Sequence, residues 1–239
     1  FAFIEGDARL LAALASGLAL YDPDSGRLQW LDRCEPAGSG RRFNDGRVDR
    51  QGRFWAGTMV EDATRAGPYS AGLYCLGADG RAQRRESGIG IANGLCWSPD
   101  GHTLYFADSP RHAIYAYDFD VDSGRIGNRR EFARTGPGVE PDGSCVDAEG
   151  CLWNAQWGAG RVLRYAPDGR VLETLETPGA LQPTCVAFAG PALDLLCVTS
   201  ARVGLAPAAL AAQAHAGDVF VYRTGTCGLR ESHARWPAA

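Results

Sequence analysis

Lysine is absent from this chain, and all 24 of its basic residues are arginine, which we attribute to genomic composition bias. An excess of positive charge is absent too. The net charge is -4, so the sequence offers no basic surface for nucleic acid or an anionic membrane. No stretch reaches the run of about 18 apolar residues that spans a bilayer, and no signal peptide is visible. We therefore expect a cytoplasmic protein with no nucleic-acid partner and no membrane partner.

The usual metal-binding patterns of cysteine and histidine are also missing. The eight cysteines form no C-x-x-C pair and the four histidines form no ligand-like doublet, so a thiolate or imidazole site is not expected. No Ser-His-Asp or Cys-His set can be read, which disfavours covalent catalysis. We expect reduced thiols, several of them behaving as small buried hydrophobes within strands. These buried thiols are Cys96, Cys145, Cys185 and Cys197.

Turn-forming residues, in contrast, are abundant, with 31 glycines and 13 prolines, a composition that favours many short strands. A turn followed by an apolar run recurs along the chain. Its copies are DRQGRFWAGT (49–58), SPDGHTLYFAD (98–108), DAEGCLWNAQ (147–156) and, more loosely, EGDARLLAA (5–13) and PALDLLCVTS (191–200). The turn glycines Gly52, Gly101 and Gly150 are 49 residues apart (101 − 52 and 150 − 101).

Each of these runs is followed by an alternating strand, a turn and a return strand. The five copies are GLALYDPDSGRL, GLYCLGADGRA, AIYAYDFDVDSGRI, RVLRYAPDGRV and DVFVYRTGTCGL. This is hairpin chemistry, and a four-stranded unit repeated about every 40–50 residues predicts an all-β fold of the β-propeller type. A β-sandwich is the alternative, but it gives no reason for the spacing of 49 to occur twice. The one helix we expect, at 207–214, is a short insertion.

A polar position also recurs, directly before the apolar runs. The segments RFNDGRVD, IANGLCWS and EPDGSCVD place Asn44, Asn93 and Asp142 at intervals of 49 (93 − 44 and 142 − 93). Asn-Gly and Asp-Gly are ordinary turn formers, but turns need no such phase. Equivalent residues of successive blades face a common channel, so we expect these three side chains to converge. Amide and carboxylate oxygens suit hard divalent cations such as Ca²⁺ and Mg²⁺, and also Mn²⁺.

Four longer segments resemble the SMP-30/gluconolactonase/regucalcin family of sugar lactonases over essentially the whole chain. They are RRFNDGRVDRQGRFWAGTM, GIANGLCWSPDGHTLYFADS, EPDGSCVDAEGCLWNAQWGAGRVLRY and FAGPALDLLCVTSARVGL. The resemblance implies a six-bladed β-propeller forming one domain over residues 1–239. Because only five blades are visible and the sequence begins at Phe1, we expect about one N-terminal blade, roughly 40–50 residues, to be missing from this chain.

The resemblance also implies a single divalent cation, which could be Ca, Zn, Mn, Mg or Fe(II). In the family it is held by a first-blade glutamate, the asparagine of NGL and the aspartate of PDG. The last two correspond to Asn93 and Asp142, and Asn44 lies close to the metal. The glutamate has no match here, because Glu5 falls in a turn rather than in the recurring polar position.

For the substrate, the resemblance implies that Arg42 and Asn44 form a contacting pair. A family glutamate after the AGTM strand contacts sugar hydroxyls; Glu61 and Asp62 are the nearest matches, and the register selects Asp62. The implied reaction is hydrolysis of a sugar lactone to its aldonic acid by metal-activated water. Arg42 would stabilise the developing oxyanion, Asn44 would orient substrate or water, and Asp142 would move a proton.

Two other functions compete with this interpretation. A paraoxonase-like esterase or phosphotriesterase would be expected to place a histidine near the metal, and none of the four histidines occupies the recurring polar position. A non-enzymatic calcium-binding protein would not need the Arg42–Asn44 pair. We expect a monomer or a weak homo-oligomer whose partner is a small-molecule sugar lactone.

Overall fold

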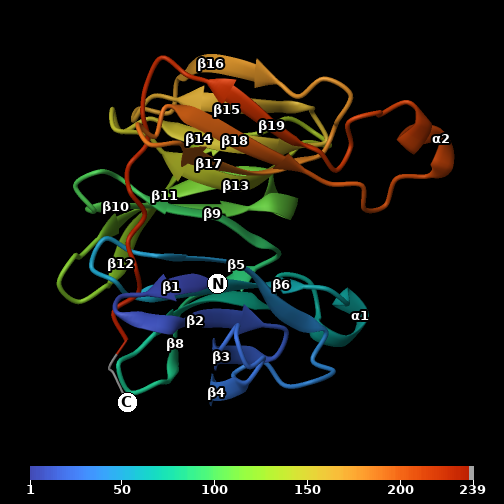
Figure 1. Cartoon of the computed structure of the whole chain (residues 1–239). Coiled ribbons are helices and arrows are strands. Elements are labelled where there is room, and N and C mark those ends of the chain that lie inside the picture. Colours follow the sequence, from blue (N-terminus) through green and yellow to red (C-terminus); the bar gives the residue numbers. More distant parts are fainter. Residues whose placement is uncertain (237–239) are drawn as a thin grey trace. The chain divides into compact units, whose positions relative to one another are not determined.

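The computed structural model describes residues 1–236, and its regular structure is almost entirely β-strand (Figure 1). The chain divides into two compact units. Unit 1 comprises residues 1–93 and 119–127 and the C-terminal segment from Glu231; unit 2 comprises 94–118 and 128–230. Among the described residues, every helix is too short or too polar to cross a bilayer.

Unit 1 contains two four-stranded antiparallel sheets, each with its strands in sequential order. The first consists of β1 (Ala2–Ile4), β2 (Asp7–Leu14), β3 (Gly17–Tyr21) and β4 (Leu28–Asp32). The second consists of β5 (Arg41–Val48), β6 (Phe54–Val60), β7 (Ala71–Leu76) and β8 (Ala82–Ile89). A one-turn helix, α1 (Ala63–Ala66), lies between β6 and β7.

Most of the remaining three sheets belong to unit 2. The third has the order β12-β11-β10-β9 and consists of β9 (Ala92–Trp97), β10 (Thr103–Asp108), β11 (Ala113–Phe119) and β12 (Ile126–Arg134), with the 3₁₀ turn η1 (Ser109–Arg111) after β10. The fourth contains β13 (Glu140–Val146), β14 (Leu152–Trp157), β15 (Arg161–Tyr165) and β16 (Val171–Glu176). The fifth contains β17 (Pro183–Ala189), β18 (Leu195–Ser200) and β19 (Val219–Arg223). The helix expected at 207–214 is confirmed in a shorter form, α2 (Pro207–Ala211).

A buried aspartate anchors two copies of the turn-and-run pattern. In the turn before β14, the Asp147 carboxylate accepts hydrogen bonds from the backbone N–H groups of Glu149 and Cys151 and from the indole Nε1 of Trp153 at 3.0 Å. Asp49 and Trp55 make the same indole bond, also 3.0 Å, before β6. Each aspartate therefore closes a turn and anchors the next strand, with its charge satisfied by several donors.

Successive antiparallel meanders of four strands are the blades of β-propeller proteins, so the all-β propeller class is confirmed. The six-bladed expectation is wrong for this chain, because the described residues form five sheets. The number six came from the family, whereas the hairpins of this sequence supply five. The first sheet is complete, since residues 2–4 supply its fourth strand.

The outer edge of β1 exposes backbone groups that need a hydrogen-bonding partner. Within unit 1 the C-terminal segment takes that place. Ile4 forms a parallel bridge with Ala234, the Glu5 N–H donates to the Ala234 carbonyl at 2.9 Å, and the Ala234 N–H donates to the Phe3 carbonyl at 2.7 Å. This pairing satisfies backbone groups that would otherwise be left at a sheet edge.

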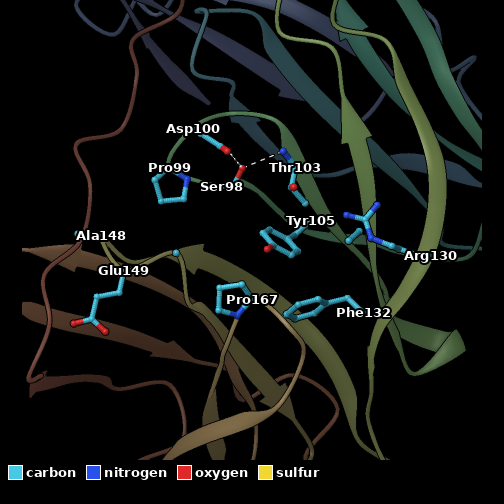
Figure 2. Close-up of a pocket in the computed structure, with 12 residues that line it drawn as sticks. Ser98, Pro99, Asp100, Thr103, Tyr105, Arg130, Phe132, Ala148, Glu149 and Pro167 are labelled. Carbon is cyan, nitrogen blue, oxygen red and sulfur yellow. Dashed lines mark hydrogen bonds between the residues drawn. The ribbon is translucent and has the colours of Figure 1, made fainter.

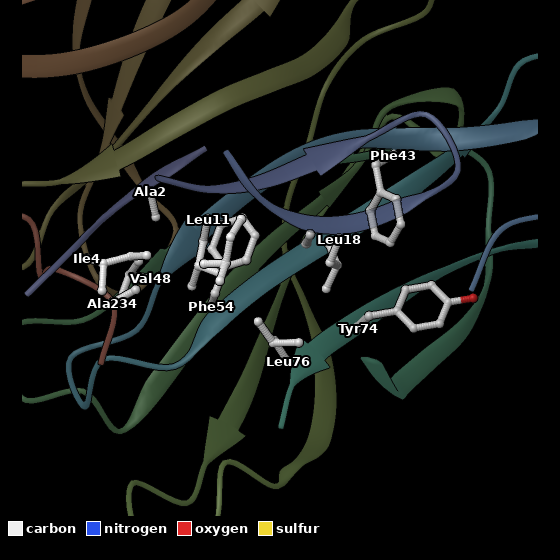
Figure 3. Packing of buried hydrophobic residues seen from close by; sticks show 12 residues of the cluster. Ala2, Ile4, Leu11, Leu18, Phe43, Val48, Phe54, Tyr74, Leu76 and Ala234 are labelled. Atoms are coloured by element: carbon white, nitrogen blue, oxygen red, sulfur yellow. The ribbon is translucent and has the colours of Figure 1, made fainter. Parts of the chain in front are cut away.

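The core of unit 1 packs between its two sheets. Figure 3 shows Leu11, Leu18, Phe43 and Phe54 meeting there, and Ala234 of the C-terminal segment belongs to the same cluster. Burial of such side chains contributes roughly 1.5–3 kcal/mol each.

None of the eight cysteines forms a disulfide bond with another described residue. Cys96 and Cys145 are buried as expected, but Cys197 is only half-buried and Cys185 is exposed. A register shift between Pro183 and Cys185 explains why the Cys185 side chain is exposed: the next residue, Val186, faces the core instead.

Candidate active site

The residues singled out by the sequence lie within the first strand of three sheets, rather than ahead of those strands as the sequence suggested. In the β5–β6 pair, Phe43 opposes Thr58 and Gly46 opposes Ala56. Asn44 and Asp45 together therefore face one residue, Gly57. This two-against-one arrangement is a β-bulge, which re-aims side chains and is common beside active sites.

The same irregularity recurs two repeats later, at the β13–β14 pair. Pro141 opposes Gln156 and Ser144 opposes Asn154, so that Asp142 and Gly143 together face the single residue between them. The two bulges are separated by twice the repeat of 49 (142 − 44 = 98). The recurring polar position is therefore a recurring backbone feature as well as a sequence pattern.

In unit 1 the first two polar positions are in direct contact. The side-chain nitrogen Nδ2 of Asn44 donates to Oδ1 of Asn93 at 2.8 Å and to the Ala92 carbonyl at 2.9 Å. Asn93 is buried, with 8% of its surface exposed. The bulge thus directs one asparagine across to the next sheet, where it orients a second asparagine.

Arg42 lies beside this asparagine pair. Its Nη1 donates to the Phe43 carbonyl at 3.0 Å and approaches Oδ1 of Asn44 at 3.5 Å, while its Nε donates to Glu61 at 2.9 Å. The side chains of Arg42 and Glu61 are 37% and 61% exposed, so water screens their ion pair and it contributes little to stability. Nη2 makes no hydrogen bond to the described residues, so it is available as a donor to solvent or a ligand.

In the structure Asp62, the expected sugar-contacting residue, lies at the start of α1. Its carboxylate caps α1 by accepting from the Thr64 N–H at 3.0 Å and the Thr64 hydroxyl at 2.6 Å, and it pairs with Arg65 at 3.2 Å. The hydrogen bond from Thr64, more than any other contact, lowers the pKa of Asp62. Glu61 is the carboxylate that contacts Arg42. The sequence did contain the signal, since an aspartate before ATRA is an N-cap pattern.

Asp142 lies in unit 2 at a point where three strands come unusually close. A Cβ added to Gly94 would sit 3.0 Å from the Asp142 carbonyl, and one added to Gly143 would sit 2.7 Å from the Cys185 sulfur and 2.8 Å from the Thr184 carbonyl. Gly94 has a positive φ of 63°, whereas Gly143 is not among the positive-φ glycines. Close approach, rather than turn geometry, therefore requires glycine after Asp142.

The donors available to a cation are oxygens. Within residues 1–236 no group of three or more His, Cys, Asp or Glu side chains is placed to hold a metal ion. Among the residues singled out by the sequence, two amides in unit 1, Asn44 and Asn93, and one carboxylate in unit 2, Asp142, offer oxygen atoms. Such donors fit an oxygen-preferring divalent cation. An amide oxygen has two lone pairs, so the hydrogen bond that Asn93 accepts is compatible with a second partner.

A cavity of about 420 Å³ lies elsewhere in unit 2, at the turn ends of the strands (Figure 2). Its walls include Pro99, Tyr105, Arg130, Phe132 and Glu149, and none of the predicted site residues lines it. Beyond Asp142, β13 continues for four residues to Val146, about 13 Å at the usual rise per strand residue, before the turn that contains Glu149. This cavity is separate from the candidate site.

The fold is an all-β propeller, and its unit 1 carries an arginine–asparagine pair, Arg42 and Asn44. A model of the SMP-30/Gluconolactonase/LRE-like region matches residues 1–202. The chain belongs to this family, which confirms the resemblance found in its sequence.

Individual relatives are similar over most of the chain. The 6-deoxy-6-sulfogluconolactonase of Pseudomonas putida is 41% identical over 224 residues, covering 92% of this chain and 75% of that protein. The L-arabinolactonase of Azospirillum brasilense is 42% identical over 231 residues, covering 96% and 75%. The crystal structure of regucalcin from Agrobacterium tumefaciens, described as a calcium-binding protein, is 36% identical with a TM-score of 0.89, covering 98% of this chain and 78% of that one.

Proposed function

We propose that this protein hydrolyses a sugar lactone to the corresponding aldonic acid with the help of one divalent cation. The contact of Asn44 with Asn93, with Arg42 alongside, is the structural observation that carries the proposal. It joins the two asparagines that the repeat singled out and places a guanidinium next to them. Two relatives more than 40% identical are named as lactonases, which supports the lactone-hydrolase class.

Asn93 and Asp142, with Asn44 close by, are the residues we assign to the cation. The candidates are Ca²⁺, Mn²⁺, Mg²⁺, Zn²⁺ and Fe(II), of which the first three suit oxygen donors best. When bound, such a cation polarises the lactone carbonyl and makes a water molecule more acidic.

The side chains of this chain then have separate tasks. As water adds to the carbonyl carbon, negative charge builds on the carbonyl oxygen, and Nη2 of Arg42 is the donor assigned to it. Asn44, held by Asn93, orients the substrate or the water. The Asp142 carboxylate takes the proton released by the water, and the ring oxygen receives a proton as its bond to the carbonyl carbon breaks.

Glu61 supports this arrangement, because its ion pair keeps Arg42 beside Asn44. We assign Glu61, in preference to Asp62, to the sugar hydroxyls, since the Asp62 carboxylate is engaged at the start of α1.

Calcium binding without catalysis is the second candidate, and the similarity to a regucalcin described as calcium-binding favours it. The deciding experiment measures acid release from gluconolactone, a pentonolactone, an aryl ester and a phosphotriester. The protein is first treated with a chelator, each cation is then added back, and the spontaneous rate is subtracted.

Metal-dependent turnover of a lactone, abolished in Asp142→Ala, is the expected result. Calcium binding with no turnover of any substrate would establish the second candidate instead. Hydrolysis at the full rate by Asp142→Ala would show that the mechanism is wrong.

A further inference from the structure

The bulge that carries Asp142 is held by a buried side chain from the neighbouring strand. Nδ2 of Asn154, in β14, donates to the Asp142 carbonyl at 2.8 Å and to the Ser144 hydroxyl at 3.0 Å. Asn154 is fully buried, with 0% of its surface exposed. The Asn154 amide therefore contacts two residues of the bulged segment. One of its partners, the Asp142 carbonyl, belongs to the part of β13 between the paired residues Pro141 and Ser144.

The internal repeat shows that this arrangement is not a general requirement of the fold. The residue equivalent to Asn154 is Ala56 beside the Asn44 bulge (154 − 98) and Tyr105 in the third sheet (154 − 49). The first bulge forms without any amide at position 56, and there the Gly46 N–H is bonded to the Asp45 carboxylate at 2.8 Å. Of these three sheets, only the one that bears Asp142 has an asparagine at this position.

Asn154 is part of a buried polar network. Its Oδ1 accepts from Nε2 of Gln156 at 2.8 Å, and the same Nε2 approaches the Tyr165 hydroxyl at 3.4 Å. Oε1 of Gln156 is buried and has no hydrogen-bond partner among residues 1–236. Burying so many polar groups costs free energy compared with apolar side chains of the same size. In return the network fixes the Asn154 amide in one orientation, and through it the bulge.

We propose that Asn154 is a positioning residue for Asp142, a role that rests on the proposed function. Holding the Asp142 carbonyl fixes the backbone dihedrals of the bulge, and these set the direction of the carboxylate. Asn154 itself is assigned no contact with the cation or the lactone. Loss of an outer residue that orients a ligand typically costs about 10–100-fold in metal affinity.

The test compares Asn154→Ala, which installs the residue of the second sheet, with Asn154→Asp, which keeps the size but removes the donor. Ser144→Ala is the matched control, because it removes a hydroxyl from the same network and leaves the Asn154–Asp142 bond in place. Mn²⁺ affinity is measured by calorimetry without substrate, together with thermal unfolding, and kcat and KM are measured at saturating Mn²⁺.

We expect both Asn154 variants to bind Mn²⁺ about 10–100-fold more weakly than wild type and Ser144→Ala to bind within about threefold of it. We also expect kcat to fall with little change in KM, because lactone contacts remain. Wild-type Mn²⁺ affinity in a folded Asn154→Ala or Asn154→Asp protein would overturn the proposal. If one variant does not fold, the other decides the question. A wild-type protein that neither binds the cation nor hydrolyses lactone would refute the proposed function itself.

Discussion

The Asn44 side chain donates a 2.8 Å hydrogen bond to the Asn93 side chain, which links equivalent positions of two successive repeats. Because Nδ2 of Asn44 is also bonded to the Ala92 carbonyl, its amide has a defined orientation, with its oxygen toward Arg42. Two positions that are equivalent in the sequence repeat are therefore in contact in the structure. Replacing the donor, Nδ2 of Asn44, tests the importance of this contact.

Replacement of Asn44 by aspartate should disturb this geometry. The carboxylate would face two acceptor oxygens where the amide nitrogen now donates, so we expect a loss of stability of about 1 kcal/mol and a much larger loss of lactone turnover. Asn128→Asp is the matched control, because Asn128 is an exposed asparagine that donates to Asp118 at 2.7 Å. Urea unfolding and initial rates measure the two effects. Equal turnover in both variants would contradict the role given to Asn44.

Two adjacent arginines should respond differently to the same substitution. Arg42→Lys keeps the charge but loses the planar set of donors, so we expect kcat/KM to fall by about 100-fold, as for other oxyanion donors. Arg41 instead bonds the buried carboxylate of Glu35 at 2.9 Å. Arg41→Lys should therefore lower the melting temperature and leave kcat/KM nearly unchanged. The opposite pattern would show that the two arginines have been assigned the wrong way round.

Gly143→Ala should be destabilising although it adds only one methyl group. The new Cβ would lie within 3 Å of Cys185 and of the Thr184 carbonyl, and relieving such contact costs about 1–3 kcal/mol. Gly136→Ala is the control within the same unit, since no atom lies within 4 Å of a Cβ added there. Chemical denaturation of both variants measures the difference. Equal stability would mean that the strands around Asp142 separate without cost.

The stability of unit 1 should fall in alkaline solution as Tyr74 titrates. Burial, followed by the charge of Glu35, raises the Tyr74 pKa from 10.0 to about 12. Between these values the unfolded chain loses the phenol proton while the folded chain keeps it, so stability decreases as pH rises through that window.

Tyr74→Phe removes this titration. We expect the slope of unfolding free energy against pH, between pH 10 and 12, to become shallower by about 1.4 kcal/mol per pH unit. Tyr69→Phe, at an exposed tyrosine, is the control. Denaturation curves at several pH values provide the measurement, and an unchanged slope in Tyr74→Phe would contradict the expected pKa.

Much of the fold could be predicted because its information is local and repeated. Turn glycines and alternating strands recur about every 49 residues, and the Asp–Trp pairs recur after twice that interval (147 − 49 = 98). Each copy specifies the same hairpin. The five hairpins counted in the sequence match the five sheets of the structure, whereas the number six, which was transferred from the family, is wrong for this chain. The pairing of Ala234 with Ile4 joins the two ends of the sequence, and no short-range pattern encodes it.

The candidate site also has features that the sequence predicts and features that only the tertiary structure shows. The sequence alone determined the recurring polar position and its glycine, since periodicity puts equivalent residues at equivalent places in successive sheets. Only the tertiary structure decided which carboxylate meets Arg42, because Asp62 is taken by the start of α1 and Glu61 is left facing the arginine. It also decided that Asn154 reaches the Asp142 bulge. Such contacts depend on strand register and helix boundaries, which arise from packing between distant parts of the chain.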